Sequence, residues 1–117
     1  MARLIGTSTA GRRRALGAFR AVVPAGRIGD GGMARFKLDS ATVAVANVSG
    51  TFFACDDVCT HRGCPLAKGH LEGATVVCPR HGGRYDLASG AVLGGPPPRP
   101  VNVHPVRVVD GQLEIQV

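Results

Sequence analysis

The sequence has few aromatic residues: four Phe, one Tyr and no Trp among 117 residues, so its core must be built mainly from Val, Ala and Leu. It also has no run of the roughly 20 apolar residues that a membrane-spanning helix needs, which excludes such a helix. Its 17 Gly and 8 Pro are too many helix breakers for a helical bundle. This length and composition favour one small all-β domain with many turns.

Acidic residues are also few, eight against 14 Lys and Arg, and the net charge is +6. Five of the Arg lie within residues 1–20, which contain no acid, so the rest of the chain is nearly neutral. A basic charge of this origin does not indicate a nucleic-acid-binding fold. We expect residues 1–17 to form a basic, flexible leader and residues 18–117 to form the domain.

The leader contains Arg12-Arg13-Arg14, a feature of one class of export signal. The apolar stretch that follows covers only residues 15–19 before Arg20 interrupts it, whereas an export signal needs about 7–15 apolar residues. We therefore expect a cytoplasmic protein, in which structural disulfides are rare.

Short apolar runs separated by turn residues predict strands at 19–23, 33–38, 42–48, 51–55, 75–77 and 91–93. The carboxyl-terminal part predicts a hairpin of residues 101–109 and 112–117 around Asp110-Gly111, a strong hairpin signal. Pro105 within the first arm indicates an edge position or a bulge. No segment predicts a convincing helix, and we expect residues 56–66 and 79–86 to be irregular loops.

These two loops carry the residues with metal-binding chemistry, Cys59-Thr60-His61 and Cys78-Pro79-Arg80-His81. Each loop offers one thiolate and one imidazole, which suit zinc or an iron–sulfur cluster better than calcium or magnesium. Zinc fingers usually pair Cys with Cys and His with His along the chain, whereas each loop here mixes them. The mixed order favours a two-iron cluster with two Cys on one iron and two His on the other. A structural zinc module is the alternative.

The residues CTHRGCPL at 59–66 and CPRHGGRYD at 78–86 resemble the two boxes of Rieske [2Fe-2S] proteins, and the resemblance extends from about Phe19 to Val117. It implies one [2Fe-2S] cluster, with Cys59 and Cys78 on one iron and His61 and His81 on the other. It also implies an antiparallel β-sandwich with a small cluster-binding subdomain, in which the two loops lie at one tip. The Pro-rich residues 94–100 match the third loop that covers the cluster in this family, or else form a polyproline spacer.

Details of the boxes resemble the soluble, low-potential Rieske ferredoxins that supply oxygenases. High-potential members join the boxes by a disulfide, but only Cys64 of that pair is present, and Arg80 stands at the other position. The Ser that donates to the cluster in those members is Gly83 here, whereas the Tyr that donates to a ligand sulfur is kept as Tyr85. We expect Tyr85, Gly83 and Pro97 to surround the cluster. Losing a hydrogen bond to the cluster lowers its potential.

The other Cys and His residues lack the spacing of ligands. We expect Cys64 to be a semi-buried free thiol and Cys55 to pack inertly in the core. We expect His70 and His104 to be surface histidines.

The three loops of the expected tip are rich in Arg. They contain Arg62, Arg80, Arg84 and Arg99 against Asp86 alone. Such a rim can form the docking face for an acidic partner, or it can be an ordinary solvated surface.

The sequence therefore predicts an electron-transfer protein and not an enzyme, because it holds no second cofactor motif and leaves no room for a substrate domain. The resemblance implies that a flavin-dependent reductase donates electrons and that a ring-hydroxylating oxygenase accepts them. We expect a monomer that binds neither nucleic acid nor membrane. The alternative is a small subunit permanently bound to a larger oxidoreductase.

Overall fold

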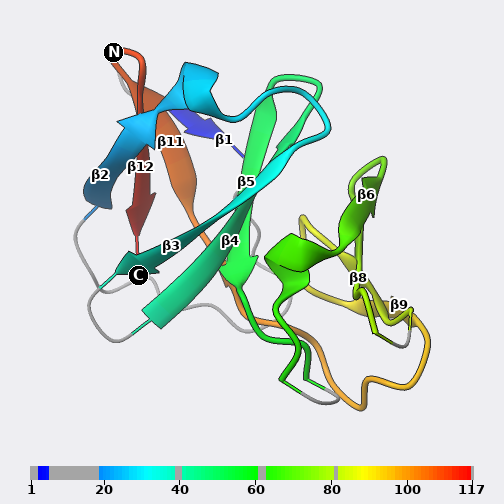
Figure 1. Cartoon of the computed structure of the whole chain (residues 1–117). Coiled ribbons are helices and arrows are strands. Elements are labelled where there is room, and N and C mark those ends of the chain that lie inside the picture. Colours follow the sequence, from blue (N-terminus) through cyan, green and yellow to red (C-terminus); the bar gives the residue numbers. More distant parts are fainter. Residues whose placement is uncertain (1–2, 6–18, 39–40, 61–62, 81, 117) are drawn as a thin grey trace.

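The structure is a computed structural model that describes residues 3–5, 19–38, 41–60, 63–80 and 82–116 (Figure 1). Within these ranges the helical elements are two short 3₁₀ turns, η1 (Ala25–Arg27) and η2 (Leu66–Lys68). None of the described helices has the length and apolar character needed to cross a bilayer. The described part of the chain is therefore almost entirely β, as the composition predicts.

Among the described residues, twelve strands form three antiparallel sheets of four strands each. The first sheet has the order β1 (Arg3–Ile5), β11 (Val106–Val109), β12 (Gln112–Gln116), β2 (Phe19–Pro24). The second has the order β10 (Val103–His104), β5 (Thr51–Asp56), β4 (Ala41–Val48), β3 (Met33–Leu38). The third and smallest has the order β6 (His70–Glu72), β7 (Thr75–Val77), β8 (Arg84–Asp86), β9 (Val92–Gly94). The antiparallel sandwich with a small added subdomain is confirmed.

The strands predicted at 19–23, 33–38, 42–48, 51–55 and 75–77 are present within one residue, and the strand predicted at 91–93 begins one residue later. The hairpin turn at Asp110-Gly111 is also confirmed, since β11 pairs with β12 across it.

The structure differs from the prediction in four places. The expected hairpin arm 101–109 is divided at Pro105 into β10 and β11, which belong to different sheets, because proline has no N–H to continue a ladder. The expectation of an irregular loop at 79–86 was wrong for Arg84–Asp86, which form β8, and β6 was not expected at all. Residues Arg3–Ile5 also form a strand, β1, which pairs with β11. The division between leader and domain stays a prediction.

Strands β4 and β5 form a wall with a hydrophobic core on each side. Side chains alternate between the two faces of a strand, and both faces of β4 are buried from Val43 to Asn47. Val43 and Val45 face one core, together with Val106, Leu113 and Ile115 of the first sheet. Small apolar residues from Val43 to Ala46 let both faces be covered, and the buried polar Asn47 is satisfied because its side-chain amide donates to the Ile28 carbonyl oxygen at 2.8 Å.

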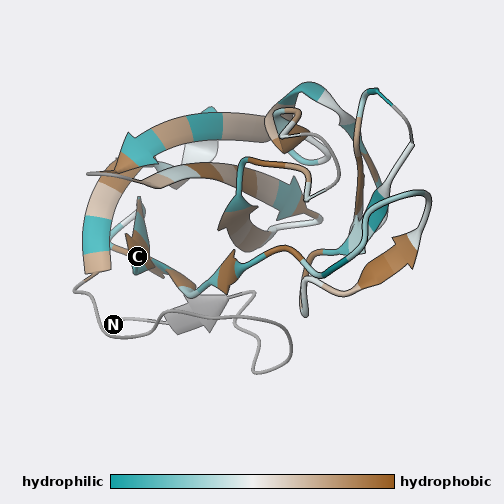
Figure 2. Ribbon diagram, turned by 90° about the horizontal axis from the view of Figure 1, so that it is seen from below, coloured by the Kyte–Doolittle hydropathy of each residue, from teal (hydrophilic) through white to brown (hydrophobic). Residues whose placement is uncertain are grey.

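The opposite face of the wall supports the small subdomain. Ala44 and Ala46 of β4 and Cys55 of β5 belong to a second core, which also contains Cys59, Leu66, Val76, Cys78, Tyr85 and Leu87. Figures 1 and 2 show the third sheet beside the two larger ones, and in Figure 1 residues 63–66 and 94–100 lie at the same lower end. The second core thus places both Cys-containing loops against one rigid sheet.

Candidate metal centre

The two loops with metal-binding residues share one backbone design. In the first, the Cys59 N–H donates to the carbonyl oxygen of Cys64 at 2.8 Å. In the second, the Cys78 N–H donates to the carbonyl oxygen of Gly83 at 2.7 Å. The fifth residue of each loop is a left-handed glycine, Gly63 with φ 71° and Gly82 with φ 70°. Each loop is therefore a closed six-residue turn that begins at a cysteine and needs glycine before its last residue.

Both cysteine side chains point into the second core. Cys59 and Cys78 are each 3% exposed and belong to the same hydrophobic cluster. None of the four cysteines, all of which lie in the described residues, forms a disulfide. The other two expected ligands, His61 and His81, lie outside the described residues, although each falls within one of the closed turns in sequence.

The hydroxyl of Tyr85, on β8, lies at the centre of a hydrogen-bond group beside Cys59. It is 3.3 Å from Cys59 Sγ and 2.9 Å from Thr60 Oγ1, and it accepts from the Thr60 N–H at 2.9 Å. The Thr60 hydroxyl donates to the carbonyl oxygen of Arg99 at 2.8 Å. Burial raises the pKa of Tyr85 to about 12, and the contact with Cys59 adds to this effect. The phenol therefore keeps its hydrogen at neutral pH.

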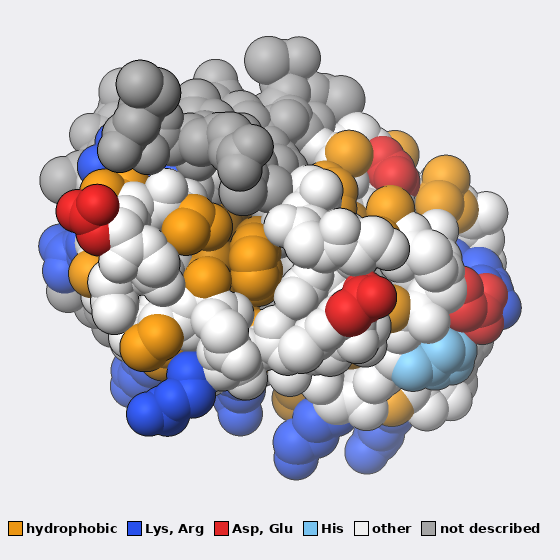
Figure 3. Space-filling model, turned by 90° about the horizontal axis from the view of Figure 1, so that it is seen from above, with side chains coloured by type: hydrophobic (Ala, Val, Ile, Leu, Met, Phe, Trp, Pro, Cys, Tyr) orange, Lys and Arg blue, Asp and Glu red, His pale blue; other side chains and the backbone are white. Residues whose placement is uncertain are grey.

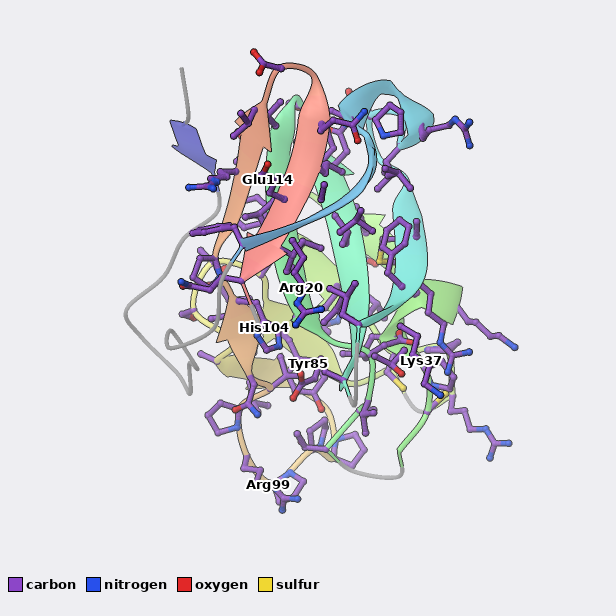
Figure 4. The ribbon with its side chains drawn as sticks, turned by 90° about the vertical axis from the view of Figure 1, so that its left-hand side faces the viewer. Arg20, Lys37, Tyr85, Arg99, His104 and Glu114 are labelled. Carbon is purple, nitrogen blue, oxygen red and sulfur yellow. The ribbon has the colours of Figure 1, made fainter. Side chains whose placement is uncertain are left out.

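Residues 94–100 lie across both turns. The carbonyl of Arg99 meets Thr60 of the first turn, and Gly95 and Pro97 pack against Gly83 of the second. A Cβ added to Gly83 would lie 2.7 Å from Cγ of the buried Pro97 and 3.7 Å from Cβ of Cys78. Figure 4 shows Arg99 at the tip beyond Tyr85. These contacts support the covering role expected of this stretch.

The buried carboxylate of Asp57, two residues before the first turn, joins η2 to β3. Asp57 is 2% exposed, and its Oδ1 accepts from the Ala67 N–H of η2 at 2.7 Å. Its Oδ2 lies 2.7 Å from Arg35 Nε of β3, an ion-pair contact that is not an aligned hydrogen bond. Sequence reasoning missed Asp57, Arg35 and Thr60, because no local pattern links residues this far apart.

The remaining cysteines behave as expected. Cys55 is 1% exposed, and burial, followed by the charges of Asp56 and Asp57, raises its pKa to about 12, so its thiol is inert. Cys64 is a half-buried free thiol.

The two histidines outside the loops differ from each other. His70 is exposed as predicted, and its Nε2 lies 3.0 Å from Glu72 Oε2. The prediction of a surface position for His104 was wrong: it is 4% exposed, and its Nε2 lies 2.7 Å from Asp56 Oδ1. The reason is that β10 pairs with β5 in the covered second sheet, which the sequence pattern did not reveal.

The charges on the tip differ in one respect from the count made on the sequence. Strand β6 places Glu72 beside Arg84, whose Nη1 donates to Glu72 Oε1, so this arginine is paired. The bond to Arg84, followed by the bond to His70, lowers the pKa of Glu72 to about 2. Arg80 and Arg99 are exposed, whereas Arg62 lies outside the described residues. Figure 3 shows the face opposite the tip, where acidic side chains are scattered and basic ones lie toward the edges.

A pocket of about 370 Å³ opens beside the first turn. Its lining includes Cys59, Thr60, Asp56 and Arg99, together with Val58, which is 46% exposed. The surface next to Cys59 therefore combines charged residues with an apolar one.

The residues present fit a [2Fe-2S] cluster held by two Cys and two His. Two buried thiols belong to one core, each begins an equivalent closed turn, and each turn contains one histidine in sequence. A tyrosine hydroxyl close to one of the sulfurs fits the hydrogen bonding that such clusters receive.

The comparisons with known proteins point to the same chemistry. The family model described as Rieske [2Fe-2S] domain matches residues 18–105. The anthranilate 1,2-dioxygenase ferredoxin subunit of Burkholderia cepacia is 40% identical over 75 residues, which are 64% of this chain and 69% of that protein. The matches to the Rieske family model and to this ferredoxin subunit argue against the alternative of a structural zinc module.

Solved structures agree in fold. The ferredoxin of Sphingomonas yanoikuyae B1 superposes with a TM-score of 0.80 at 31% identity, over 86% of this chain and 99% of that chain. A chain in the complex of reduced oxygenase and oxidized ferredoxin in carbazole 1,9a-dioxygenase gives a TM-score of 0.79 at 30% identity, over 84% of this chain and 92% of that chain.

Proposed function

Since this chain belongs to the Rieske [2Fe-2S] family, we propose that it carries single electrons from a flavin-dependent reductase to a ring-hydroxylating oxygenase. Its relatives are ferredoxin components of dioxygenase systems, so the chain is an electron carrier with one [2Fe-2S] cluster and not itself an enzyme. A solved complex of a similar ferredoxin with its oxygenase supports the identity of the acceptor.

The cluster ligands in this proposal are Cys59, His61, Cys78 and His81. The observation that carries it is the pair of equivalent closed turns, which bring two buried thiols into one core. When bound, the cluster supplies a site that accepts and releases one electron. The chain itself buries the two sulfurs, places the Tyr85 hydroxyl beside one of them, and covers the turns with residues 94–100.

The ligand assignment is tested by electron paramagnetic resonance of the reduced protein. We expect His81→Ala to lose the Rieske-type signal, because one iron then lacks a protein ligand. The matched control is His70→Ala, which removes an exposed imidazole paired with Glu72 and leaves the signal unchanged. A full Rieske signal in the His81 variant would show that the assignment is wrong.

We propose that the acceptor docks on the tip and presents acidic residues there. Arg80 and Arg99 are exposed on two of the three loops, and Arg62 is expected to add to them. Arg84 contributes less than the sequence suggested, because Glu72 neutralises it. Val58, beside Cys59, offers the apolar contact that the centre of an interface prefers. Close approach of the cluster to the partner requires docking at this end.

This docking face is tested by the rate of electron transfer to the oxygenase against ionic strength. Opposite charges speed the encounter, so salt should slow the reaction. We expect the salt dependence to persist in a chain that starts at Gly17 and to disappear in the double variant Arg62→Glu, Arg80→Glu. The control is Arg27→Glu, Lys37→Glu, an equal change of charge on η1 and β3. If the salt dependence of the rate disappears when the leader is removed, the leader and not the tip attracts the oxygenase.

We further propose that the protein is a cytoplasmic monomer that moves between its partners. Gel filtration at micromolar concentration should give the mass of one chain. Co-purification of a stoichiometric larger oxidoreductase from the native host would indicate a permanently bound subunit instead.

A further inference from the structure

Thr60 forms hydrogen bonds with two residues that are distant in sequence. Its N–H and its hydroxyl both contact the Tyr85 hydroxyl at 2.9 Å, and its hydroxyl also contacts the Arg99 carbonyl at 2.8 Å. The same Tyr85 oxygen lies 3.3 Å from Cys59 Sγ. Thr60 thus joins the first turn, β8 and the covering loop at a point next to a proposed ligand sulfur.

The hydrogens in this group can be assigned from the chemistry of each atom. An amide N–H only donates, so the Thr60 N–H occupies one acceptor position on the Tyr85 oxygen. A carbonyl only accepts, so the contact with Arg99 takes the one hydrogen of the Thr60 hydroxyl. When Cys59 is bound to iron as a thiolate, the hydrogen of Tyr85 is the only one that remains. It has two acceptors within reach, Thr60 Oγ1 and Cys59 Sγ.

We propose that Thr60 is a positioning residue that competes with the Cys59 sulfur for the hydrogen of Tyr85, and so holds the midpoint potential below the value that Tyr85 would otherwise set. This inference rests on the proposed function, in which Cys59 is a ligand of the cluster.

The competition affects the potential because the two oxidation states differ in charge. A thiolate bound to iron has no hydrogen and can only accept. Reduction adds one negative charge to the cluster, so a hydrogen bond to its sulfur stabilises the reduced state more than the oxidised state. An acceptor that draws the same hydrogen away reduces this stabilisation. The Thr60 oxygen is well suited to accept, because its own hydrogen is bound to Arg99.

The test is the midpoint potential of the loaded protein by voltammetry in four variants. Thr60→Val removes the hydroxyl and keeps the branched shape, so the Tyr85 hydrogen passes to the sulfur and the midpoint rises. We expect a shift of about tenfold in the equilibrium constant of reduction, or about 59 mV for one electron. Thr60→Ser keeps the hydroxyl and should leave the midpoint at the wild-type value. Tyr85→Phe removes the shared hydrogen and should lower the midpoint.

The double variant Thr60→Val, Tyr85→Phe separates competition from a structural effect. Without the tyrosine hydrogen there is nothing to compete for, so this variant should have the same midpoint as Tyr85→Phe alone. Should Thr60→Val not assemble, Thr60→Ala carries the same expectation.

Two results would overturn the inference while the Rieske signal is intact. One is a midpoint that falls or stays unchanged when the Thr60 hydroxyl is removed. The other is a rise that persists when Thr60→Val is added to Tyr85→Phe. Absence of the Rieske signal from the wild-type protein would instead overturn the proposed function, and this inference with it.

Discussion

Replacing Gly83 by Ser should raise the midpoint potential only if Pro97 is also made smaller. A serine hydroxyl beside Cys78 can donate to the cluster and stabilise its reduced state. However, the Cβ of residue 83 would lie 2.7 Å from Pro97 Cγ and 3.1 Å from Pro97 Cδ. Carbon atoms pack best at about 3.5–4.0 Å, so the overlap approaches about 1 Å. Pro97 is buried, and its ring cannot relieve the overlap by changing rotamer as a flexible side chain can.

This overlap sets the size of the expected effect on stability. Overpacking of this kind costs about 1–3 kcal/mol. For a domain of this size, each kcal/mol corresponds to roughly 4–8 °C in melting temperature. Gly83→Ser alone should therefore melt at least about 4 °C below the wild type. Adding Pro97→Ala should recover most of this loss, because the ring carbons that overlap are then absent.

The assay combines thermal denaturation with voltammetry on the same loaded samples. We expect the double variant Gly83→Ser, Pro97→Ala to have a higher midpoint than either single variant. Gly94→Ser is the matched control, since its Cβ would meet only Arg84 Cδ at 3.6 Å, and it should change neither quantity. The steric reasoning is refuted if Gly83→Ser alone keeps the wild-type melting temperature and raises the midpoint as much as the double variant.

Three further predictions concern the potential and the charged groups. Because the disulfide between the loops is absent and Gly83 carries no hydroxyl, the wild-type midpoint should lie toward the lower end of the Rieske range of about −150 to +300 mV, and a voltammetric value above about +150 mV would contradict this. The pKa of Glu72 is lowered to about 2 by its bond to Arg84, so its contribution to stability is present above the ordinary pKa of 4.5 and is lost as pH falls toward 2. The difference in urea midpoint between wild type and Glu72→Gln should accordingly shrink over this acid range. A difference that stays constant with pH would show that ionisation of Glu72 does not contribute to stability. Arg35→Met leaves the buried Asp57 without its cation and should lower the free energy of unfolding by about 1–3 kcal/mol, measured by urea titration, whereas an unchanged value would mean that water replaces the pair.

The metal-binding residues and most of the strands could be predicted from the sequence, because both depend on local order. Residues 59–64 and 78–83 each form a closed turn within six positions, so the type and spacing of their side chains are visible in the printed chain. The alternation of Val and Ala from Val43 to Ala46 likewise reports a strand directly, since successive side chains of a strand take opposite faces.

Only the tertiary structure decided which residues surround the two turns. The contacts of Tyr85 with Thr60, of Arg99 with Thr60, and of Pro97 with Gly83 join segments 14 to 39 residues apart. The burial of His104 was equally hidden. Periodicity records which face of a strand is apolar, but it does not record which strands pair or which loop crosses another. Strand pairing and loop crossing depend on which elements cover the two faces of the second sheet. They determine which hydrogen bonds a buried sulfur can receive.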